Sequence, residues 1–144
     1  MARNGKFNAR RVKADGYTFD SQAEAAEYGR LKLLQMANEI SGLQVHPRFP
    51  LEVNGKRICV YEADFSFLER TPKTTAGVRL TFFSVRRVVL DVKGFATPEY
   101  KIKCELFKAL YPDADFRELN TDKSSTRKAW TKFAGARVQT QGTK

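Results

Sequence analysis

The stretch VVLDVKG at residues 88–94 decides the fold. Its aliphatic residues predict a strand near the centre of a sheet, and this strand ends in two opposite charges. Because side chains alternate between the two faces of a strand, we expect Asp91 and Lys93 on one face and Val92 on the other. A carboxylate that can hold a metal and an ammonium that can orient a water or a phosphate would then share one rim. Alone, the Asp-x-Lys pattern is equally typical of a rim ion pair, which contributes little to stability.

A second acid lies upstream in another apolar segment. Asp64 is part of ADFSF at residues 63–67, in which Phe65 and Phe67 are predicted to pack into the core. Asp64 therefore takes the opposite face of the same strand, where a carboxylate without a partner would meet solvent. Its chemistry depends on whether the fold brings it to Asp91.

A third acid, Glu24, comes near the start of an amphipathic helix. It shares a helical stripe with Tyr28 and Leu31, which carries its carboxylate toward the core side. Ser21, three residues earlier, also predicts a capping box, in which Glu24 would bond to a backbone amide at the helix start. Glu27 lies beside the same stripe, so spacing alone does not choose between the two glutamates. A carboxylate held near the sheet is costly unless it is paired, hydrogen-bonded or bound to a metal.

Hydrophobic periodicity and turn residues predict a helix, three or four strands, a second helix and a last strand. Asn54-Gly55 supplies the two positive-φ positions of a tight hairpin turn. In chain order the predicted elements are a helix over about 22–38, strands over 49–53 and 57–67, a polar loop over 69–77, extended segments over 78–84 and 87–93, a helix over 99–110 and a strand over 114–119. The two extended segments form one bent strand or two, and the pattern does not decide which.

These elements predict an α/β domain with a mixed central sheet flanked by helices, in the order α-β-β-β-α-β. The strand–helix–strand unit near the end requires a parallel pair, while the Asn-Gly hairpin is antiparallel. A chain of 144 residues is long enough for one such domain with a buried core. We place the domain at residues 17–119, between a flexible basic arm at 1–16 and a basic C-terminal tail at 120–144.

The net charge of +10 is concentrated at the two ends of the chain. Residues 1–16 carry five Lys or Arg and one Asp, residues 120–144 carry six and one, and the middle carries fifteen basic and fourteen acidic side chains. Basic ends suit the phosphate backbone of a nucleic acid, where contacts release counterions. An anionic membrane surface or an acidic protein partner would also fit this charge. The candidates for backbone contact in the two ends are Arg10, Arg11, Lys128 and Lys132.

The sequence also argues against several other classes of protein. No segment approaches the roughly 18 consecutive apolar residues of a membrane span, and no apolar signal-peptide core follows the basic N-terminus, so we expect a cytoplasmic protein. Cys59 and Cys104 are far apart and lack metal-ligand spacing, which predicts buried, reduced thiols rather than a disulfide or a zinc site. His46, the only histidine, precedes Pro47 in a predicted loop, where a structural role is commoner than a catalytic one.

Taken together, these segments follow the order of motifs in the PD-(D/E)XK nuclease superfamily, and they resemble small endonucleases of that superfamily encoded by bacteriophages. The segments that carry the resemblance are FDSQAE at 19–24, ADF at 63–65, DVKG at 91–94 and TPEYK at 97–101. The resemblance covers residues 17–119 and implies a restriction-endonuclease-like core. The proline that names the motif is replaced by Ala63, at a position that varies widely in the superfamily. The extended stretch 78–87 is longer than this branch usually needs, which predicts an insertion or an extra strand.

The resemblance implies a divalent metal site that hydrolyses phosphodiester bonds without a covalent intermediate. Asp64 and Asp91 would be direct ligands of Mg²⁺ or Mn²⁺, helped by the Val92 carbonyl, and Glu24 would complete the site directly or through a water. Lys93 would hold or polarise the attacking water. Hard divalent cations prefer oxygen ligands, and a bound cation can lower the pKa of a water and stabilise developing negative charge. We therefore expect Glu24, Asp64, Asp91 and Lys93 to meet in one pocket.

The resulting prediction is a metal-dependent DNA endonuclease, a hydrolase whose basic arms hold the substrate. Lys101 and Lys103, at the start of the second helix, would contact the DNA backbone, although an ordinary solvated helix face explains them equally well. Related small nucleases include Holliday-junction resolvases, which cut branched DNA as dimers in recombination, so a homodimer on branched DNA is the leading version. The alternative is a non-catalytic nucleic-acid-binding accessory protein that keeps the nuclease fold, and the intact set of Asp64, Asp91 and Lys93 argues against it.

Overall fold

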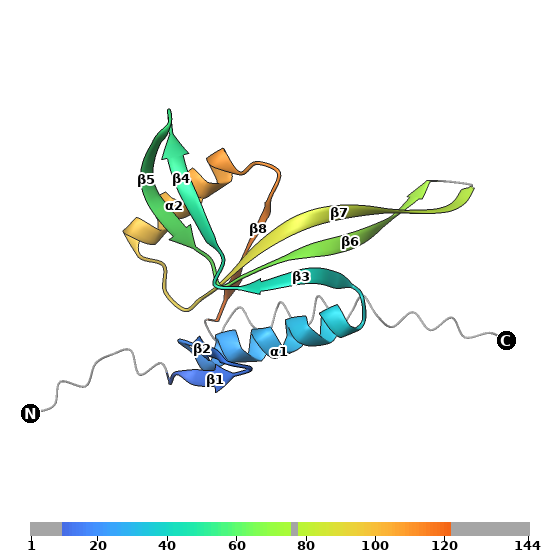
Figure 1. The fold of residues 1–144 in the computed structure, drawn as a ribbon, viewed down its shortest axis with the longest axis horizontal. Coiled ribbons are helices and arrows are strands. Elements are labelled where there is room, and N and C mark those ends of the chain that lie inside the picture. Colours follow the sequence, from blue (N-terminus) through green and yellow to red (C-terminus); the bar gives the residue numbers. More distant parts are fainter. Residues whose placement is uncertain (1–9, 76–77, 122–144) are drawn as a thin grey trace, which may run out of the picture.

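The computed structural model describes residues 10–75 and 78–121, which form two helices and eight strands (Figure 1). Four strands make a central sheet, and the other four make two separate hairpins. In chain order the elements are β1 Val12–Ala14, β2 Tyr17–Phe19, α1 Gln22–Met36, β3 Ile40–Val45, β4 Arg48–Val53, β5 Lys56–Glu62, β6 Phe65–Thr75, β7 Val78–Lys93, α2 Pro98–Leu110 and β8 Asp115–Asn120.

The central sheet has the strand order β3-β6-β7-β8 and is mixed. β6 pairs antiparallel with both β3 and β7, whereas β7 and β8 are parallel neighbours connected through α2. The predicted mixed α/β architecture and its strand–helix–strand unit are therefore confirmed. β4 and β5 form the predicted antiparallel hairpin, in which the turn residues Asn54 and Gly55 have φ values of 51° and 77°.

Each face of the central sheet is covered by a different layer (Figure 1). α1 and β2 pack on one face, in a core that includes Leu31 and Leu90. α2 and the β4–β5 hairpin pack on the other face, around Val89 and Phe107. β7 contributes to both cores because its side chains alternate, and this alternation places the fully buried Asp91 on the Val89 face.

The N-terminal boundary of the domain differs from the prediction. Val12–Ala14 form β1 and pair with β2, where the prediction was a flexible arm. Asp15 and Gly16 make the turn between them with φ values of 50° and 82°, the same positive-φ pair that Asn-Gly provides in the other hairpin. Residues 1–9 and 122–144, which hold the rest of the predicted arm and tail, lie outside the described residues.

The predicted polar loop over 69–77 is also wrong. β6 continues to Thr75 and pairs with β7, which is one strand rather than two. Pairing of β6 with β3 ends at Glu69, so Pro72 lies where β6 has a neighbour on one side only. An edge position tolerates proline, because no second strand needs its missing N–H.

Two further boundaries follow from local irregularities. The predicted strand over 57–67 is divided at Ala63–Asp64 into β5 and β6, which join different sheets. β3 was not predicted, because Ser41-Gly42 weakens its strand pattern; Gly42 has a φ of 62°, and the pairing with β6 shifts register between Ser41 and Gln44.

Two smaller predictions concern membrane spans and thiols. Within 10–75 and 78–121, neither helix is long and apolar enough to span a bilayer. Cys59 and Cys104 are free thiols, as predicted. Cys104, on the core side of α2, is buried as expected, whereas Cys59 is partly exposed.

Phe107 joins α2 to the β4–β5 hairpin. It is fully buried, and its ring centroid lies 5.0 Å from that of Phe49 and 5.1 Å from that of Tyr61. We expect Phe107→Ala to lower the free energy of unfolding by about 3–5 kcal/mol, because removing a buried ring leaves a cavity. Urea denaturation measures the change. Ile102→Ala, at an exposed position of the same helix, should change stability by less than about 0.5 kcal/mol. Equal losses in the two variants would contradict this packing.

Candidate metal centre

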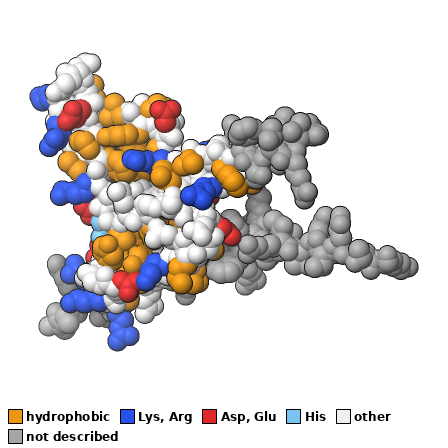
Figure 2. Space-filling model, turned by 45° about the vertical axis from the view of Figure 1, so that its right-hand side comes forward, with side chains coloured by type: hydrophobic (Ala, Val, Ile, Leu, Met, Phe, Trp, Pro, Cys, Tyr) orange, Lys and Arg blue, Asp and Glu red, His pale blue; other side chains and the backbone are white. Residues whose placement is uncertain are grey.

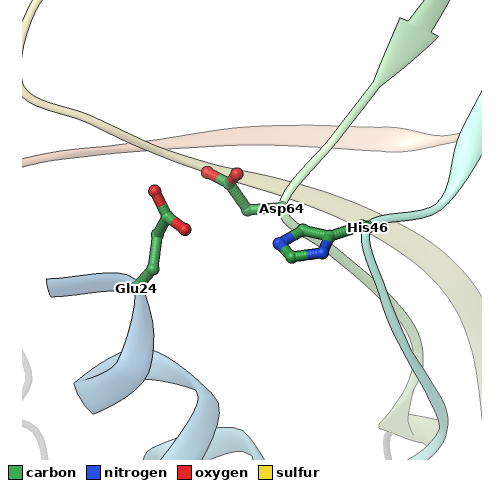
Figure 3. Close-up of side chains that lie close together, drawn as sticks. All are labelled: Glu24, His46 and Asp64. Atoms are coloured by element: carbon green, nitrogen blue, oxygen red, sulfur yellow. The ribbon is translucent and has the colours of Figure 1, made fainter. Parts of the chain in front are cut away.

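Three potential metal ligands from separate parts of the chain point toward one another (Figure 3). Glu24 comes from the first turn of α1, His46 from the turn between β3 and β4, and Asp64 from the break between β5 and β6. One ligand atom of each side chain lies within 4.8 Å of the other two. Two carboxylates and an imidazole at this spacing form a donor set that suits a divalent cation.

Glu24 serves the helix start and the cluster at once. The Glu24 amide donates to Ser21 Oγ at 3.1 Å, and Glu24 Oε2 accepts a hydrogen bond from the Asp20 amide at 3.1 Å. The predicted capping interaction is therefore present, with the carboxylate bonded to Asp20 rather than to Ser21. Burial raises the pKa of Glu24, and the Asp20 amide and the charge of Lys93 oppose this rise.

Glu27 was the alternative to Glu24. It is also buried, but its two carboxylate oxygens accept hydrogen bonds from Arg30 Nε, each at 3.0 Å. Its charge is therefore balanced within α1, one turn along from the cluster. The fold selects Glu24 as the glutamate that faces Asp64.

His46 is the residue of the cluster that the sequence did not reveal. The backbone N–H of His46 donates to the Asp64 carbonyl at 2.9 Å, and the backbone N–H of Ala63 donates to the Pro47 carbonyl at 3.0 Å. These two bonds fasten the turn after β3 to the break before β6, so the imidazole and the Asp64 carboxylate lie on neighbouring backbone. The predicted loop position is correct, and the ring also packs 5.9 Å from that of Phe19.

Asp64 and Asp91 are joined by reciprocal hydrogen bonds between their segments. The Asp64 amide donates to Asp91 Oδ1 at 3.1 Å, and the Val92 amide donates to Asp64 Oδ2 at 2.6 Å. Asp91 Oδ2 accepts a hydrogen bond from the Tyr61 hydroxyl, and Asp91 has no solvent exposure. Asp91 therefore lies directly behind Asp64, and the three-residue ligand cluster does not include it.

The electrostatics of the site are those of crowded acids. Burial raises the pKa of Asp64 to about 7, and the charges of Asp91 and Glu24 add to this rise. The Val92 amide and Lys93 act in the opposite direction. A cation at this position would favour the charged form of Asp64 and reduce the repulsion among the carboxylates.

Lys93 lies on the Asp91 face of β7, as predicted from strand alternation. Its Nζ is 4.8 Å from the centroid of the Tyr100 ring in α2. Its charge lowers the pKa of both Glu24 and Asp64, so it is within electrostatic reach of the two carboxylates. The structure therefore brings all four predicted residues into one neighbourhood, with Asp91 beneath the cluster and Lys93 beside it.

The basic residues predicted to contact nucleic acid differ in their exposure and in their ion pairing. Arg10, Arg11 and Lys101 are exposed, and Arg11 Nε lies 3.4 Å from Asp20 Oδ1. Lys103 Nζ lies 3.2 Å from a carboxylate oxygen of Glu99 in the same helix. Lys128 and Lys132 fall outside the described residues. On the face drawn in Figure 2, Lys and Arg side chains lie among apolar ones and are more widespread than Asp and Glu.

Comparison with known proteins assigns the chain to a family. The model of the family described as "Protein of unknown function (DUF1064)" matches residues 4–126, which is most of the chain. No curated protein and no solved structure gives a significant match. The geometry of the site is therefore the principal guide to its chemistry.

The donor set predicts divalent-metal binding that can be measured directly. We expect Mn²⁺ to bind the native protein in isothermal titration calorimetry, with EDTA reversing the binding. Glu24→Gln and His46→Ala should each weaken the affinity by at least about tenfold, since even the outer partners of metal ligands have effects of this size. Glu105→Gln, an exposed glutamate of α2, is the control and should bind like the native protein. Unchanged affinity in both cluster variants would contradict the assignment.

The raised pKa of Asp64 predicts how stability depends on pH without metal. The folded protein holds the Asp64 proton up to a pKa of about 7, whereas the unfolded chain releases it near the ordinary aspartate pKa of 3.8. Asp64 therefore favours the folded state least above that window, and stability falls as pH rises through it. Asp64→Asn should flatten this dependence in urea denaturation, whereas Asp113→Asn, at an exposed position, should not. Identical pH profiles for native protein and Asp64→Asn would contradict the prediction.

Proposed function

The chain belongs to the DUF1064 family, and we propose that it is a metal-dependent endonuclease that hydrolyses phosphodiester bonds in DNA. The observation that carries this proposal is the convergence of Glu24, His46 and Asp64, whose ligand atoms lie within 4.8 Å of one another. Lys93 beside this cluster supplies the positive charge that phosphoryl chemistry needs. The order of these residues along the chain, which resembles that of PD-(D/E)XK nucleases, supports a restriction-endonuclease-like core.

Glu24, His46 and Asp64 would hold the ion, which we propose to be Mn²⁺ or Mg²⁺. The carboxylates suit either ion, and the imidazole nitrogen, a softer donor, favours Mn²⁺. The ion when bound would lower the pKa of a water and stabilise the negative charge that develops on the phosphate. The Asp20 amide keeps one oxygen of Glu24 in place, so the carboxylate is oriented before any ion arrives.

Asp91 has a different proposed role from the one that the resemblance implies. Its carboxylate accepts hydrogen bonds from the Tyr61 hydroxyl and the Asp64 amide, and it is fully buried. We therefore assign Asp91 as a positioning residue that fixes the backbone of Asp64. Val92 enters the site through its amide, which orients Asp64 Oδ2. Direct ligation by Asp91 and the Val92 carbonyl stays a prediction from the resemblance.

Lys93 would orient the attacking water and stabilise negative charge on the phosphate. In the hydrolysis, a water oxygen forms a bond to phosphorus and the bond from phosphorus to the leaving oxygen breaks. One proton passes from the water to solvent or to a neighbouring base, and one is returned to the leaving oxygen. No side chain of the cluster needs to form a covalent bond to the substrate.

The proposed substrate is DNA, with branched DNA cut by a homodimer as the leading version. Arg10, Arg11 and Lys101 are exposed and would contact the phosphate backbone. The non-catalytic accessory protein is the alternative. It would bind the same DNA, but it gives no reason to gather two carboxylates and an imidazole where phosphates must approach.

The test is cleavage of linear, flapped and four-way-branched DNA with Mn²⁺, Mg²⁺ or EDTA. We expect metal-dependent cutting by the native protein. Lys93→Ala and Glu24→Gln should each lower the rate by at least about a hundredfold, as the loss of one group that stabilises transition-state charge does elsewhere. Lys56→Ala, at the exposed turn of the β4–β5 hairpin, removes the same charge away from the site and should cut normally.

Product analysis on denaturing gels separates the outcomes. Binding without cutting by the native protein with either metal would favour the accessory protein. Cutting that persists in EDTA or in both variants would mean that a different site, or a contaminating nuclease, is responsible.

A further inference from the structure

The β6–β7 hairpin extends beyond the rest of the domain as a two-stranded ribbon (Figure 1). The pairing of β6 with β3 ends at Glu69, and the pairing of β7 with β8 begins at Val88. From Glu69 to the end of β6 at Thr75 the ribbon reaches about 20 Å, at the usual rise of a strand. Among the described residues no further strand pairs with this part of the hairpin, and an isolated two-stranded ribbon is marginally stable in water. Its length and isolation therefore point to a partner.

The sequence of this ribbon is strongly basic. Residues 70–87 contain five basic residues, Arg70, Lys73, Arg79, Arg86 and Arg87, and neither Asp nor Glu. Arg70 and Arg87 are exposed, and neither has an ion-pair partner among residues 10–75 and 78–121. Arg86, by contrast, has an acidic neighbour, because its Nη1 lies 3.4 Å from Asp115 Oδ2. The free guanidinium groups are complementary to a polyanion, and bidentate contact with phosphate suits arginine in particular.

Arginine and apolar side chains share one face of the ribbon. Arg70 pairs with Val85 across the two strands, which places their side chains on the same face. Alternation along β7 adds Phe83 and Arg87 to that face. Phe83 and Val85 are 58% and 59% exposed. The same alternation places Lys93 on this side of β7, with the buried Val89 and Asp91 between it and the exposed part of the ribbon.

Arg87 connects the ribbon to the candidate metal centre. It lines an open cavity of about 600 Å³, together with Arg48, Val45 and Pro47. His46 of the cluster lies between the last two residues in the chain. A polyanion that followed the ribbon would therefore reach this cavity, whose lining includes both chain neighbours of His46 but none of the three cluster residues.

We propose that the β6–β7 ribbon binds duplex DNA and holds it against the candidate metal centre. The inference rests on the proposed function for its substrate class and names the form of DNA that the site receives. The major groove of B-DNA is about 12 Å wide and admits a two-stranded ribbon, whereas the deep, narrow groove of an RNA helix does not. Arg70 and Arg87 contact phosphates on either side, and Phe83 and Val85 face the base edges, where apolar side chains contact thymine methyl groups.

The test measures binding of fluorescent duplex DNA to the full chain by anisotropy, in EDTA, between about 50 and 200 mM NaCl. The double variant Arg70→Gln/Arg87→Gln should bind at least about tenfold more weakly, and the slope of log affinity against log salt should fall by about 2. Lys56→Gln/Arg57→Gln removes the same charge from the turn of the β4–β5 hairpin and should change neither quantity. Both double variants alter exposed side chains, and circular dichroism checks that they fold.

Several results would overturn the proposal. They are an absence of duplex binding by the native protein, unchanged affinity and slope in Arg70→Gln/Arg87→Gln, or equal losses in the control variant. Tighter binding of single-stranded DNA or duplex RNA would also overturn it. If sedimentation shows a dimer that Phe83→Ser converts to a monomer with unchanged DNA affinity, the ribbon is a protein interface and the proposal fails.

Failure of the ribbon and failure of the nuclease are separable, because binding in EDTA requires no catalysis. Weakened binding in Arg70→Gln/Arg87→Gln, combined with no cutting by the native protein, keeps the ribbon and rejects the nuclease. Metal-dependent cutting by the native protein, combined with unaltered binding in the double variant, keeps the nuclease and rejects the ribbon.

Discussion

The hydrogen bonds between Asp64 and the end of β7 are the constraint on which the rest of the site depends. The Asp64 amide donates to Asp91, and the Val92 amide donates back to the Asp64 carboxylate. This exchange fixes the backbone at the point where the chain leaves the β4–β5 hairpin and enters the central sheet. His46 is bonded to the same point through the Asp64 carbonyl. One junction therefore sets the direction of β6, the place of the imidazole and the orientation of the carboxylate.

Burying these acids costs free energy, and the structure satisfies Asp91 more fully than Asp64 and Glu24. Asp91, the most buried, receives hydrogen bonds from the Tyr61 hydroxyl and from a backbone amide, so each of its carboxylate oxygens has a partner inside the protein. Asp64 and Glu24 are less completely satisfied, and burial raises the pKa of each. A buried acid with a purely structural role is expected to be paired with a basic side chain of the protein, as Glu27 is with Arg30. The remaining demand for positive charge is concentrated at Glu24, His46 and Asp64, where a cation could supply it.

Much of the fold could be predicted from local signals, and the errors have physical causes. Asn54-Gly55 predicts one hairpin correctly, whereas Asp15-Gly16, also a positive-φ pair, lies inside a basic segment whose pattern does not indicate strands. The polar stretch 69–75 contains Pro72 and few apolar residues, so local pattern favours a loop. It becomes a strand because β7 extends far enough to pair with it. Pairing between distant segments is a property of the whole chain, and no window around residue 72 contains it.

The residues of the candidate site also divide into those that local pattern can predict and those that depend on pairing between distant segments. Glu24, Asp64, Asp91 and Lys93 could be proposed because strand alternation, a helical stripe and motif order each place one of them. His46 could not, because its side chain reaches the cluster only through the pairing of its backbone with Asp64, in a turn with no helical or strand periodicity. The distinction between Asp91 and Asp64 was equally hidden, since both are acids at strand ends. Burial decides it: Tyr61 from β5 covers Asp91, while Asp64 stays partly open beside His46 and Glu24. A sequence can thus name the acids of such a site, but only the packing of the hairpin over β7 determines which of them joins Glu24 and His46 in the cluster.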